Sequence, residues 1–421
     1  MSSTLHRLSG RDGISVAFPA SLRDAPELAV DDVCLAALAE PWPWPEWFRP
    51  RFLVEVSPLA PDRATVPQLG THLIAEQIAR GAHVAASDLW PVSSGEDGRR
   101  IISLVPVMDD TIVRLQYVSI RGGREVLITA EHSAANQKLS EAIFRDAVGS
   151  IHVTFDDAPP EPDASAMPAL DPFASEGGSD FEDLSGVRGA QPYRSSGPPL
   201  SEEQIDAVRR GKLRRVERDA LEAARLVDPR GRLTETGAAA RRALDSPART
   251  VTAEVVGDES AHVSRLEVLQ GAKATAVLAG PPPGSRAGER TLDVIASRTS
   301  PIALARWLGL APAWTVALRD DGEWTLPLDP AVLDARLTQA VAPPPPDASR
   351  GLRWMWEQPW QIATISGGTP ARRLRVITTP RAGYFRLERD HASGRAALSP
   401  LPPEYYLREL LWFGGFDLSR S

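Results

Sequence analysis

The chain has 421 residues, a formal net charge of -8, 43% hydrophobic residues and 24% charged residues. This length suits two or three domains, and the composition is that of ordinary globular proteins. The negative charge argues against a nucleic-acid partner, because phosphate binding requires a positive field. The single cysteine, Cys34, excludes an internal disulfide and a zinc site made of four thiolates. Cys34 lies in an apolar run, so we expect it to fill the core.

Residues 12–155 predict an α+β domain in which helices pack on an antiparallel sheet. Segments typical of strands occur at 14–18, 51–56, 83–89, 100–106, 112–120 and 125–131. The last two strands are joined by Arg-Gly-Gly-Arg at 121–124, which is a strong hairpin signal. Residues 136–148 carry an apolar stripe and predict a helix that closes the domain.

Another helix is expected over 65–81. Thr65 is a suitable N-cap, Pro67 fits the first turn, and Gln68 stands where a capping box requires a glutamine or glutamate. Gly81 would end the helix, because glycine readily adopts the left-handed conformation found at helix ends.

Residues 156–199 form the clearest boundary in the chain. They are rich in proline, serine, glycine and acidic residues and contain few residues that could build a core. This composition predicts a disordered, flexible linker. Two shorter breaks follow: residues 280–290 indicate a long hairpin loop, and residues 342–351 indicate a separator between two later segments.

The second half, 200–418, opens with charged helices. Residues 201–246 predict at least two of them, broken at Asp228 and Pro229. Six basic residues could contact a DNA backbone as part of a winged helix: Arg209, Arg210, Lys212, Arg214, Arg215 and Arg218. Acidic residues interleave with them and can form ion pairs along the helix, so a solvated helix face is the preferred interpretation.

The most informative feature is a repeated order of elements in 250–310 and 359–416: a strand, a hairpin, another strand and a helix. The first copy comprises strands at 251–256, 265–269, 274–279 and 292–296 and a helix at 301–308. The second copy comprises strands at 360–365, 373–378, 383–388 and 396–398 and a helix at 402–413. A duplicated sheet-plus-helix unit predicts a pseudo-symmetric scaffold.

No catalytic pattern accompanies this repeat. The sequence has no phosphate loop, no Rossmann glycine fingerprint and no His-Glu-x-x-His motif. Its seven histidines show no metal-ligand spacing: His6, His72, His83, His132, His152, His262 and His391. A Ser/His/acid set can be written for Glu131, His132 and Ser133, but neighbours on a strand point to opposite faces, so a solvated strand end is preferred. We therefore expect no catalytic residue, no cofactor-binding residue and no metal ligand, and we assign no partner-binding residue.

Tryptophan is the one enriched aromatic residue, and it occurs in two clusters. The first, in a proline-broken segment, contains Trp42, Trp44 and Trp47, and the second contains Trp354, Trp356 and Trp360. Indole rings bury large apolar areas and are also common in binding hot spots, with core packing as the default. Trp354 and Trp356 are expected to alternate on a strand, facing either a core or an exposed docking sheet.

Several segments of the second half carry a family resemblance. They are the acidic helix start at 200–203, "VDPRGRLTETGAAARRALDSPARTVTAEVVG", "SRLEVLQGAKATAVLAG", and "RRLRVITTPRAGYFRLERD" followed by "ALSPLPPEYYLREL". In these segments the chain resembles the EspG family of type VII secretion chaperones, which implies a quasi-two-fold α+β domain over 200–418. A late strand of that family reads "DTPxGRY", whereas residues 378–384 here lack the acid and the same spacing.

The first half is similar to another fold family. The capped helix at 65–81, the strand meander of 100–131 and the final helix ending "FRDAVGSIHVTF" carry this resemblance. In these features residues 12–155 resemble the PsbP-like fold of DcrB and LpqN-type proteins. Many LpqN-type relatives are exported lipoproteins, but the signal and lipobox are missing at the start of this sequence, so we expect a cytoplasmic protein.

Together these observations predict a non-enzymatic adaptor or chaperone of an actinobacterial type VII-like (ESX) secretion system. Its partner would be a protein client, expected to be a helical secretion substrate, held by a helix in a groove or by capture at a sheet edge. We expect no nucleic-acid partner, no membrane insertion and no cofactor. A DNA-binding regulator acting through 201–246 and an immunity-type protein-binding module remain the alternatives.

Overall fold

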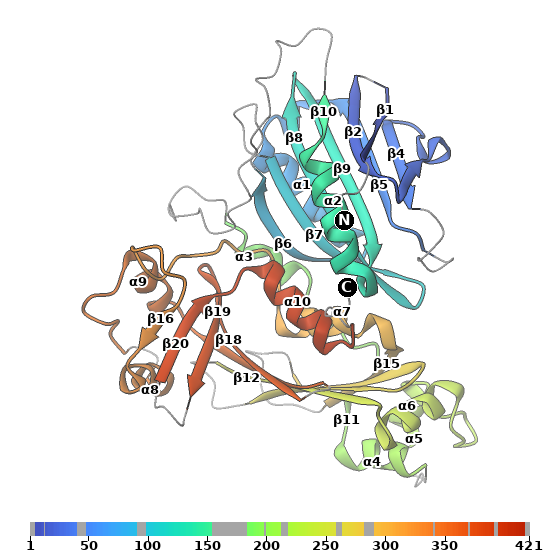
Figure 1. The fold of residues 1–421 in the computed structure, drawn as a ribbon. Helices are drawn as coiled ribbons and strands as arrows, with labels where there is room; N and C mark the ends of the chain where they lie inside the picture. Colours follow the sequence, from blue (N-terminus) through green and yellow to red (C-terminus); the bar gives the residue numbers. More distant parts are fainter. Residues whose placement is uncertain are drawn as a thin grey trace. The chain divides into compact units, whose positions relative to one another are not determined.

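We describe a computed structural model of the chain, shown in Figure 1. The described residues are 5–11, 13–39, 48–90, 98–153, 183–197, 199–211, 218–257, 263–281, 290–339, 342–368, 371–390 and 395–416. The chain divides into two compact units: unit 1 comprises Met1–Val107, Thr111–Pro172 and Phe416–Ser421, and unit 2 comprises Met108–Asp110 and Phe173–Gly415. Each unit combines antiparallel sheets with helices, so the predicted α+β class is confirmed.

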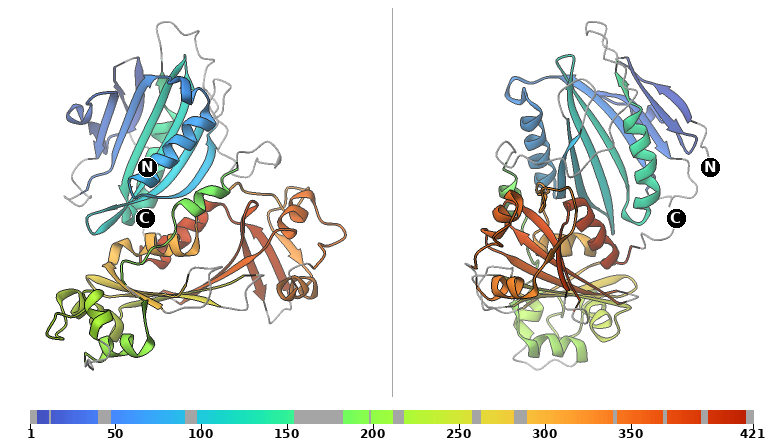
Figure 2. Two further views of the ribbon diagram at one scale, coloured as in Figure 1. Left: turned by 180° about the vertical axis from the view of Figure 1, so that it is seen from behind. Right: turned by 60° about the vertical axis from the view of Figure 1, so that its left-hand side comes forward.

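Unit 1 contains a seven-stranded sheet and a smaller three-stranded sheet. The larger sheet has the order β3-β4-β5-β9-β8-β7-β6, made of β3 (Leu22–Asp24), β4 (Val33–Ala39), β5 (Arg51–Pro58), β6 (His83–Trp90), β7 (Gly98–Val107), β8 (Asp110–Arg121) and β9 (Arg124–Ser133). The smaller sheet has the order β1-β2-β10, made of β1 (Leu5–Ser9), β2 (Ile14–Pro19) and β10 (His152–Val153). Helices α1 (Val66–Ala79) and α2 (Gln137–Gly149) lie on opposite faces of the larger sheet, as Figure 2 shows.

Local sequence signals account for the start of α1 and for the β8–β9 hairpin. Thr65 and Gln68 form the predicted capping box: the Gln68 N–H donates to Thr65 Oγ1 (3.4 Å), and the Thr65 N–H donates to Gln68 Oε1 (3.1 Å). Gly122 and Gly123 have φ angles of 53° and 71°, which a two-residue hairpin turn with positive φ requires. Both predictions are confirmed.

The face of the sheet that α2 covers is apolar. The rings of Phe18 and Phe52 lie 5.0 Å apart edge to face, and the rings of Phe52 and Phe144 lie 6.1 Å apart. Cys34, in β4, is also buried, as predicted. These side chains come from four separate elements, so the core closes only when α2 docks on the sheet.

The other face, beneath α1, carries a buried polar network. Arg114 donates to Glu131 Oε1 (2.6 Å) and to Gln77 Oε1 (2.8 Å), and Gln77 donates in turn to Gln116 Oε1 (2.8 Å). Arg51 binds the second oxygen of Glu131. Burial by itself would raise the pKa of Glu131, but the guanidinium groups of Arg114 and Arg51 outweigh it, and the pKa is lowered. The carboxylate therefore stays charged inside unit 1 and ties β5, β8 and β9 together.

His132 corrects one of the sequence predictions. We expected a solvated strand end, but β9 continues through Ser133, and His132 is completely buried, with its ring 6.1 Å from that of Phe144. Its Nδ1–H donates to the carbonyl oxygen of Ser133 (3.0 Å). Burial lowers the pKa of His132 to about 4, because the imidazolium would lose its hydration. The prediction was wrong because the covering helix α2 comes from a later part of the chain.

We expect His132 to make unit 1 less stable in mild acid. The unfolded chain takes up a proton near pH 6.5, whereas the folded state resists protonation until about pH 4. Stability should therefore fall by about 3 kcal/mol as the pH drops from 6.5 to 4, with no further loss from this group below that range. Hydrogen exchange of peptides from β9, measured across this pH range, checks how steeply the stability depends on pH.

The variant His132→Leu provides the control, since leucine fills a similar volume and does not titrate. It loses one hydrogen bond at every pH, so the variant should be somewhat less stable at pH 7 but should depend less on pH between 6.5 and 4. Equal slopes in the two proteins would contradict the assignment.

Unit 2 is built on one ten-stranded sheet with the order β11-β15-β14-β13-β12-β17-β18-β19-β20-β16. Its strands are β11 (Pro199–Leu200), β12 (Arg249–Gly257), β13 (Ser264–Gln270), β14 (Ala274–Ala279), β15 (Arg290–Ala296), β16 (Leu326–Leu328), β17 (Gln361–Gly367), β18 (Arg372–Thr379), β19 (Gly383–Asp390) and β20 (Arg395–Pro400). Its helices are α3 (Ser185–Ala190), α4 (Glu202–Arg210), α5 (Arg218–Ala223), α6 (Glu235–Asp245), α7 (Ser300–Leu308), α8 (Pro330–Thr338), α9 (Arg350–Trp356) and α10 (Pro403–Phe413).

The predicted repeat is visible in the order of these strands. Reading outward from the centre, β12-β13-β14-β15 of the first copy mirrors β17-β18-β19-β20 of the second. The copies meet where β12 pairs antiparallel with β17, with Glu254 opposite Thr364. Helices α7 and α10 end the two copies and contact each other on one face of the sheet (Figure 1). The order of the strands is therefore that expected for two copies related by a local two-fold axis through the β12–β17 pair.

Each copy holds the end of the other copy's helix. Tyr384, in β19, lies beyond the end of α7: its hydroxyl accepts the Ala311 N–H (2.8 Å) and lies 3.2 Å from the carbonyl oxygen of Gly309. Gln270, in β13, lies beyond the end of α10 and donates from Nε2 to the carbonyl oxygen of Gly414 (2.8 Å). These contacts satisfy backbone groups that a helix end leaves unpaired, and they interlock the copies.

Replacement of Tyr384 by phenylalanine should destabilise unit 2. The hydroxyl is buried, so its removal leaves the backbone groups at the end of α7 without this partner, at a cost of about 1–3 kcal/mol. Tyr405→Phe is the matched control, because Tyr405 is 44% exposed on α10 and should tolerate the change. Urea unfolding of both variants measures the difference, and similar losses of stability would contradict the capping role.

Two further sequence predictions for this half were wrong. Part of the predicted linker is folded: α3 lies within 156–199, and Asp293 of β15 accepts hydrogen bonds from the Tyr193 hydroxyl and from the Ser196 N–H (2.8 Å). Residues 154–182 lie outside the described parts of the chain. Trp354 and Trp356 lie on helix α9 and not on a strand, since Ser349 caps this helix through the Leu352 N–H (3.0 Å).

Candidate functional site

The two ends of the ten-stranded sheet are closed in a similar way. The outermost strands are very short, and each contains a proline: Pro199 in β11 and Pro327 in β16. Proline has no backbone N–H, so neither strand offers a complete row of hydrogen-bonding groups to another chain. Capture of a partner at either edge of this sheet, one form of the sheet-edge binding expected from the sequence, is therefore disfavoured.

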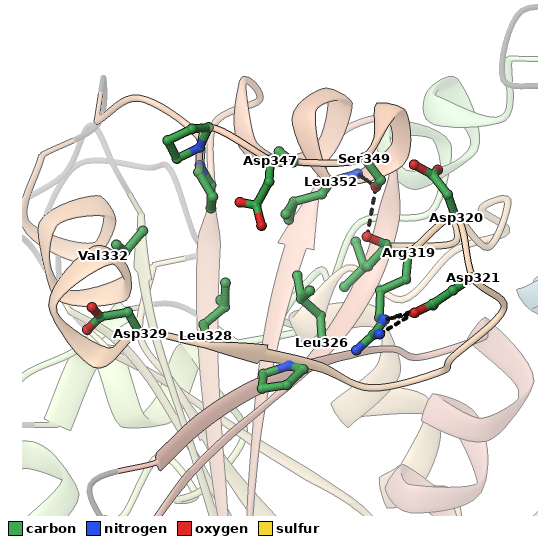
Figure 3. A pocket seen from close by; sticks show the side chains of 15 residues that line it. Arg319, Asp320, Asp321, Leu326, Leu328, Asp329, Val332, Asp347, Ser349 and Leu352 are labelled. Carbon is green, nitrogen blue, oxygen red and sulfur yellow. Dashed lines mark hydrogen bonds and ion pairs between the residues drawn. The ribbon is translucent and has the colours of Figure 1, made fainter.

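A groove lies beside β16, formed by the residues that connect the two copies. Helices α8 and α9 and the segment 345–349 surround a cavity of about 620 Å³ (Figure 3). Its apolar side chains are Leu326 and Leu328 of β16, Leu318, Val332 of α8 and Leu352 of α9. Figure 3 shows Leu326 and Leu328 pointing from β16 into the cavity. The volume falls within the range of ordinary ligand pockets.

Four aspartates surround this apolar surface. Asp329 lies at one end of the groove, Asp320 and Asp321 lie at the other, and Asp347 lies on the segment above (Figure 3). Arg319 is the one basic residue among the lining side chains, and its Nε donates to Asp321 at 2.8 Å. This hydrogen bond lowers the pKa of Asp321 to about 2. The lining therefore has four carboxylates against one guanidinium and attracts positive charge.

The walls of the groove are fixed by contacts to the core behind it. Arg336 of α8 is buried and lies 4.4 Å over the ring of Trp360. It donates to the carbonyl oxygens of Trp356 (3.2 Å) and Gln358 (2.7 Å), which ties α8 to the end of α9. Asp334, also on α8, accepts two hydrogen bonds from Arg389 of β19 (2.6 and 2.9 Å). These contacts fix the positions of the helices that form the walls of the groove.

The tryptophans of the second cluster belong to this supporting core. Trp356 and Trp360 are buried, with their rings 5.1 Å apart edge to face, while Trp354 is partly buried against the same cluster. Core packing, the default interpretation, is confirmed for Trp356 and Trp360. The first cluster, Trp42, Trp44 and Trp47, lies outside the described residues.

The structure does not bring the other sequence candidates together as a site. Over the described parts of the chain, no group of three or more histidine, cysteine, aspartate or glutamate residues could hold a metal ion. His83 and His132 are buried, His72 and His152 are exposed, and His6 is half-buried. His262 and His391 lie outside the described residues.

The basic helical stretch shows the expected ion pairs where it is described. Arg209 lies 3.0 Å from Asp206, and Arg218 lies 4.0 Å from Glu222. Both pairs are exposed or half-exposed and follow helical spacing, which supports a solvated helix face over a DNA contact. Lys212, Arg214 and Arg215 lie outside the described residues.

The groove was not predicted from the sequence. The segment 342–351 was interpreted only as a separator, although Pro345, Pro346 and Asp347 line the groove. The alternation of Leu326 and Leu328 around Pro327 could have indicated a short edge strand. No local signal shows that this strand, α8 and α9 surround one cavity.

The helices of the described residues are all too short or too polar to span a membrane. No protein-family model matches the sequence, and no curated protein matches it.

Solved structures similar to part of the chain include the following three. Cyanobacterial PsbP (CyanoP) from Synechocystis has 17% identity over 37% of this chain and 94% of its own, with a TM-score of 0.29. The Ran-binding protein Mog1p of Saccharomyces cerevisiae has 12% identity over 37% and 97%, with a TM-score of 0.28. A mutant form of Mog1 has 13% identity over 37% and 98%, also with a TM-score of 0.28.

A PsbP protein is therefore among the structures similar to part of this chain. This similarity supports a PsbP-like fold for that part and nothing more. The likeness carries no inference about binding or activity. None of the three structures is an EspG-type chaperone, so the resemblance of the second half stays a prediction.

Proposed function

We propose that this chain is a non-enzymatic adaptor or chaperone that binds a segment of another polypeptide in the groove beside β16. The observation that carries the proposal is the combination of fixed walls with an apolar surface formed by the partly buried side chains of Leu326, Leu328 and Val332. Burial of each leucine-sized side chain against such a surface contributes about 1.5–3 kcal/mol before the cost of ordering the partner.

The duplicated sheet supports this proposal in a second way. It provides a broad, rigid base, and the connection between the copies is the part that departs from the repeat and forms the groove. Binding sites are often carried by connecting segments that a rigid scaffold holds in place.

The cellular role that we propose rests on the resemblance described for residues 200–418. An EspG-like chaperone would act in the cytoplasm of an actinobacterium and would hold a helical substrate of a type VII-like secretion system. The first half, 12–155, would add a second surface for docking. An absence of enzymatic activity is part of the same proposal.

The proposal predicts that one substitution in the groove weakens client binding. Leu328→Asp places a carboxylate on the apolar floor, so the affinity for a helical secretion substrate encoded beside this chain should fall at least about tenfold. Titration calorimetry with the full-length chain measures the affinity, and centrifugation after co-expression measures how much client stays soluble.

Val30→Asp is the matched control, since Val30 is 59% exposed in unit 1 and does not line the groove. Circular dichroism should show native folding of both variants, and Leu326→Asp replaces Leu328→Asp if the latter unfolds. A wild-type chain that binds no such client, or that binds it equally well after either groove substitution, would contradict the proposed function.

A further inference from the structure

We propose that the groove takes one face of a basic amphipathic helix from the partner polypeptide. The apolar stripe of that helix would lie on the partly buried Leu326, Leu328 and Val332, and its flanking lysine or arginine side chains would lie against the surrounding aspartates. This inference rests on the proposed function and names the chemistry of the segment that the groove recognises.

A helix fits the groove better than an extended segment because of backbone hydrogen bonding. An extended peptide buried there needs partners for its own N–H and C=O groups, and unpaired groups cost free energy. The strand edge that lines the groove is β16, which has three residues and a proline at its centre. An α-helix satisfies its backbone internally, so it can bury side chains against this surface without a strand partner.

The charges around the groove select basic over acidic partners. Asp320, Asp321, Asp329 and Asp347 lie on several sides of the apolar floor, and Arg319 is already engaged by Asp321. Lysine or arginine residues on both borders of an apolar stripe would find a carboxylate nearby in either direction. An acidic helix would bring like charges together at the groove and would be repelled.

The four aspartates differ in what else they do, and this difference makes the inference testable. Asp321 holds Arg319, and Asp329 caps α8 by accepting the Ala331 N–H (2.8 Å). Changes at these two positions would disturb the walls of the groove. Among the described residues, the side chains of Asp320 and Asp347 make no hydrogen bond or ion pair, so Asp320→Asn with Asp347→Asn removes two charges and preserves the shape of the side chains.

The experiment compares three labelled synthetic peptides of about 15 residues by fluorescence anisotropy with the full-length chain. The first has leucines at positions i, i+3, i+4 and i+7 and lysines on both borders of this stripe. The second has glutamate in place of each lysine. The third is the first peptide with its central residue replaced by proline, which prevents a continuous helix.

We expect the lysine peptide to bind at least about tenfold more tightly than the glutamate peptide at low salt, and the preference to shrink as salt is added. The proline-containing peptide should bind at least about tenfold more weakly than its parent. The double variant Asp320→Asn/Asp347→Asn should weaken binding of the lysine peptide about three- to tenfold.

Asp219→Asn with Asp245→Asn is the matched control, because it removes the same charge from exposed positions on α5 and α6. Equal weakening by this pair would show a general charge effect and would overturn the assignment to the groove. Equal affinities of the lysine and glutamate peptides would overturn the proposed preference for basic partners. Equal affinities of the proline peptide and the lysine peptide would overturn the proposal that the partner binds as a helix.

These outcomes separate the inference from the proposed function. If both charged peptides bind equally to the wild-type chain and more weakly to the Leu328→Asp variant, the groove binds polypeptides but does not distinguish basic from acidic ones. If none of the three peptides binds while a co-encoded client binds in a Leu328-dependent way, the inference fails and the proposed function stands. If neither peptides nor clients bind, both fail.

Discussion

Antiparallel pairing between β12 and β17 is the contact on which the rest of unit 2 depends. It joins two copies of one meander into a single ten-stranded sheet, with Glu254 opposite Thr364. Because the pairing is antiparallel, the second copy runs outward in the opposite sense, and the two terminal helices meet on one face. Tyr384 and Gln270 then hold the end of the helix that belongs to the other copy, so neither copy completes its polar contacts alone.

A sheet extended by duplication must still end at both sides. Short strands that contain Pro199 and Pro327 close the two edges, which limits the addition of further strands. At the β16 end, the connection between the copies also folds back as α8 and α9 and forms the groove. The repeat thus provides a rigid base, and the segment that breaks the repeat carries the candidate site. Figure 1 shows α4–α6 at the opposite end of the same sheet.

Much of the fold could be predicted because the deciding signals are local. The capping box at Thr65, the positive φ angles of Gly122 and Gly123, and the alternation of apolar residues act over a few neighbouring positions. The errors have a common origin in contacts between distant segments. The strand pattern around His132 does not show that helix α2 covers this residue. Trp356 lies on a helix because Ser349 caps the start of α9.

The α+β class, the repeated order of elements and the position of most strands follow from the amino-acid sequence, since hydrophobic period and turn chemistry are properties of short stretches of chain. Which polar groups are buried, where the sheet ends and which side chains surround the groove depend on how distant segments pack together. Leu318, Leu328 and Leu352 come from three separate segments of the chain but line the same cavity. Their proximity depends on long-range pairing and packing, which no local pattern encodes.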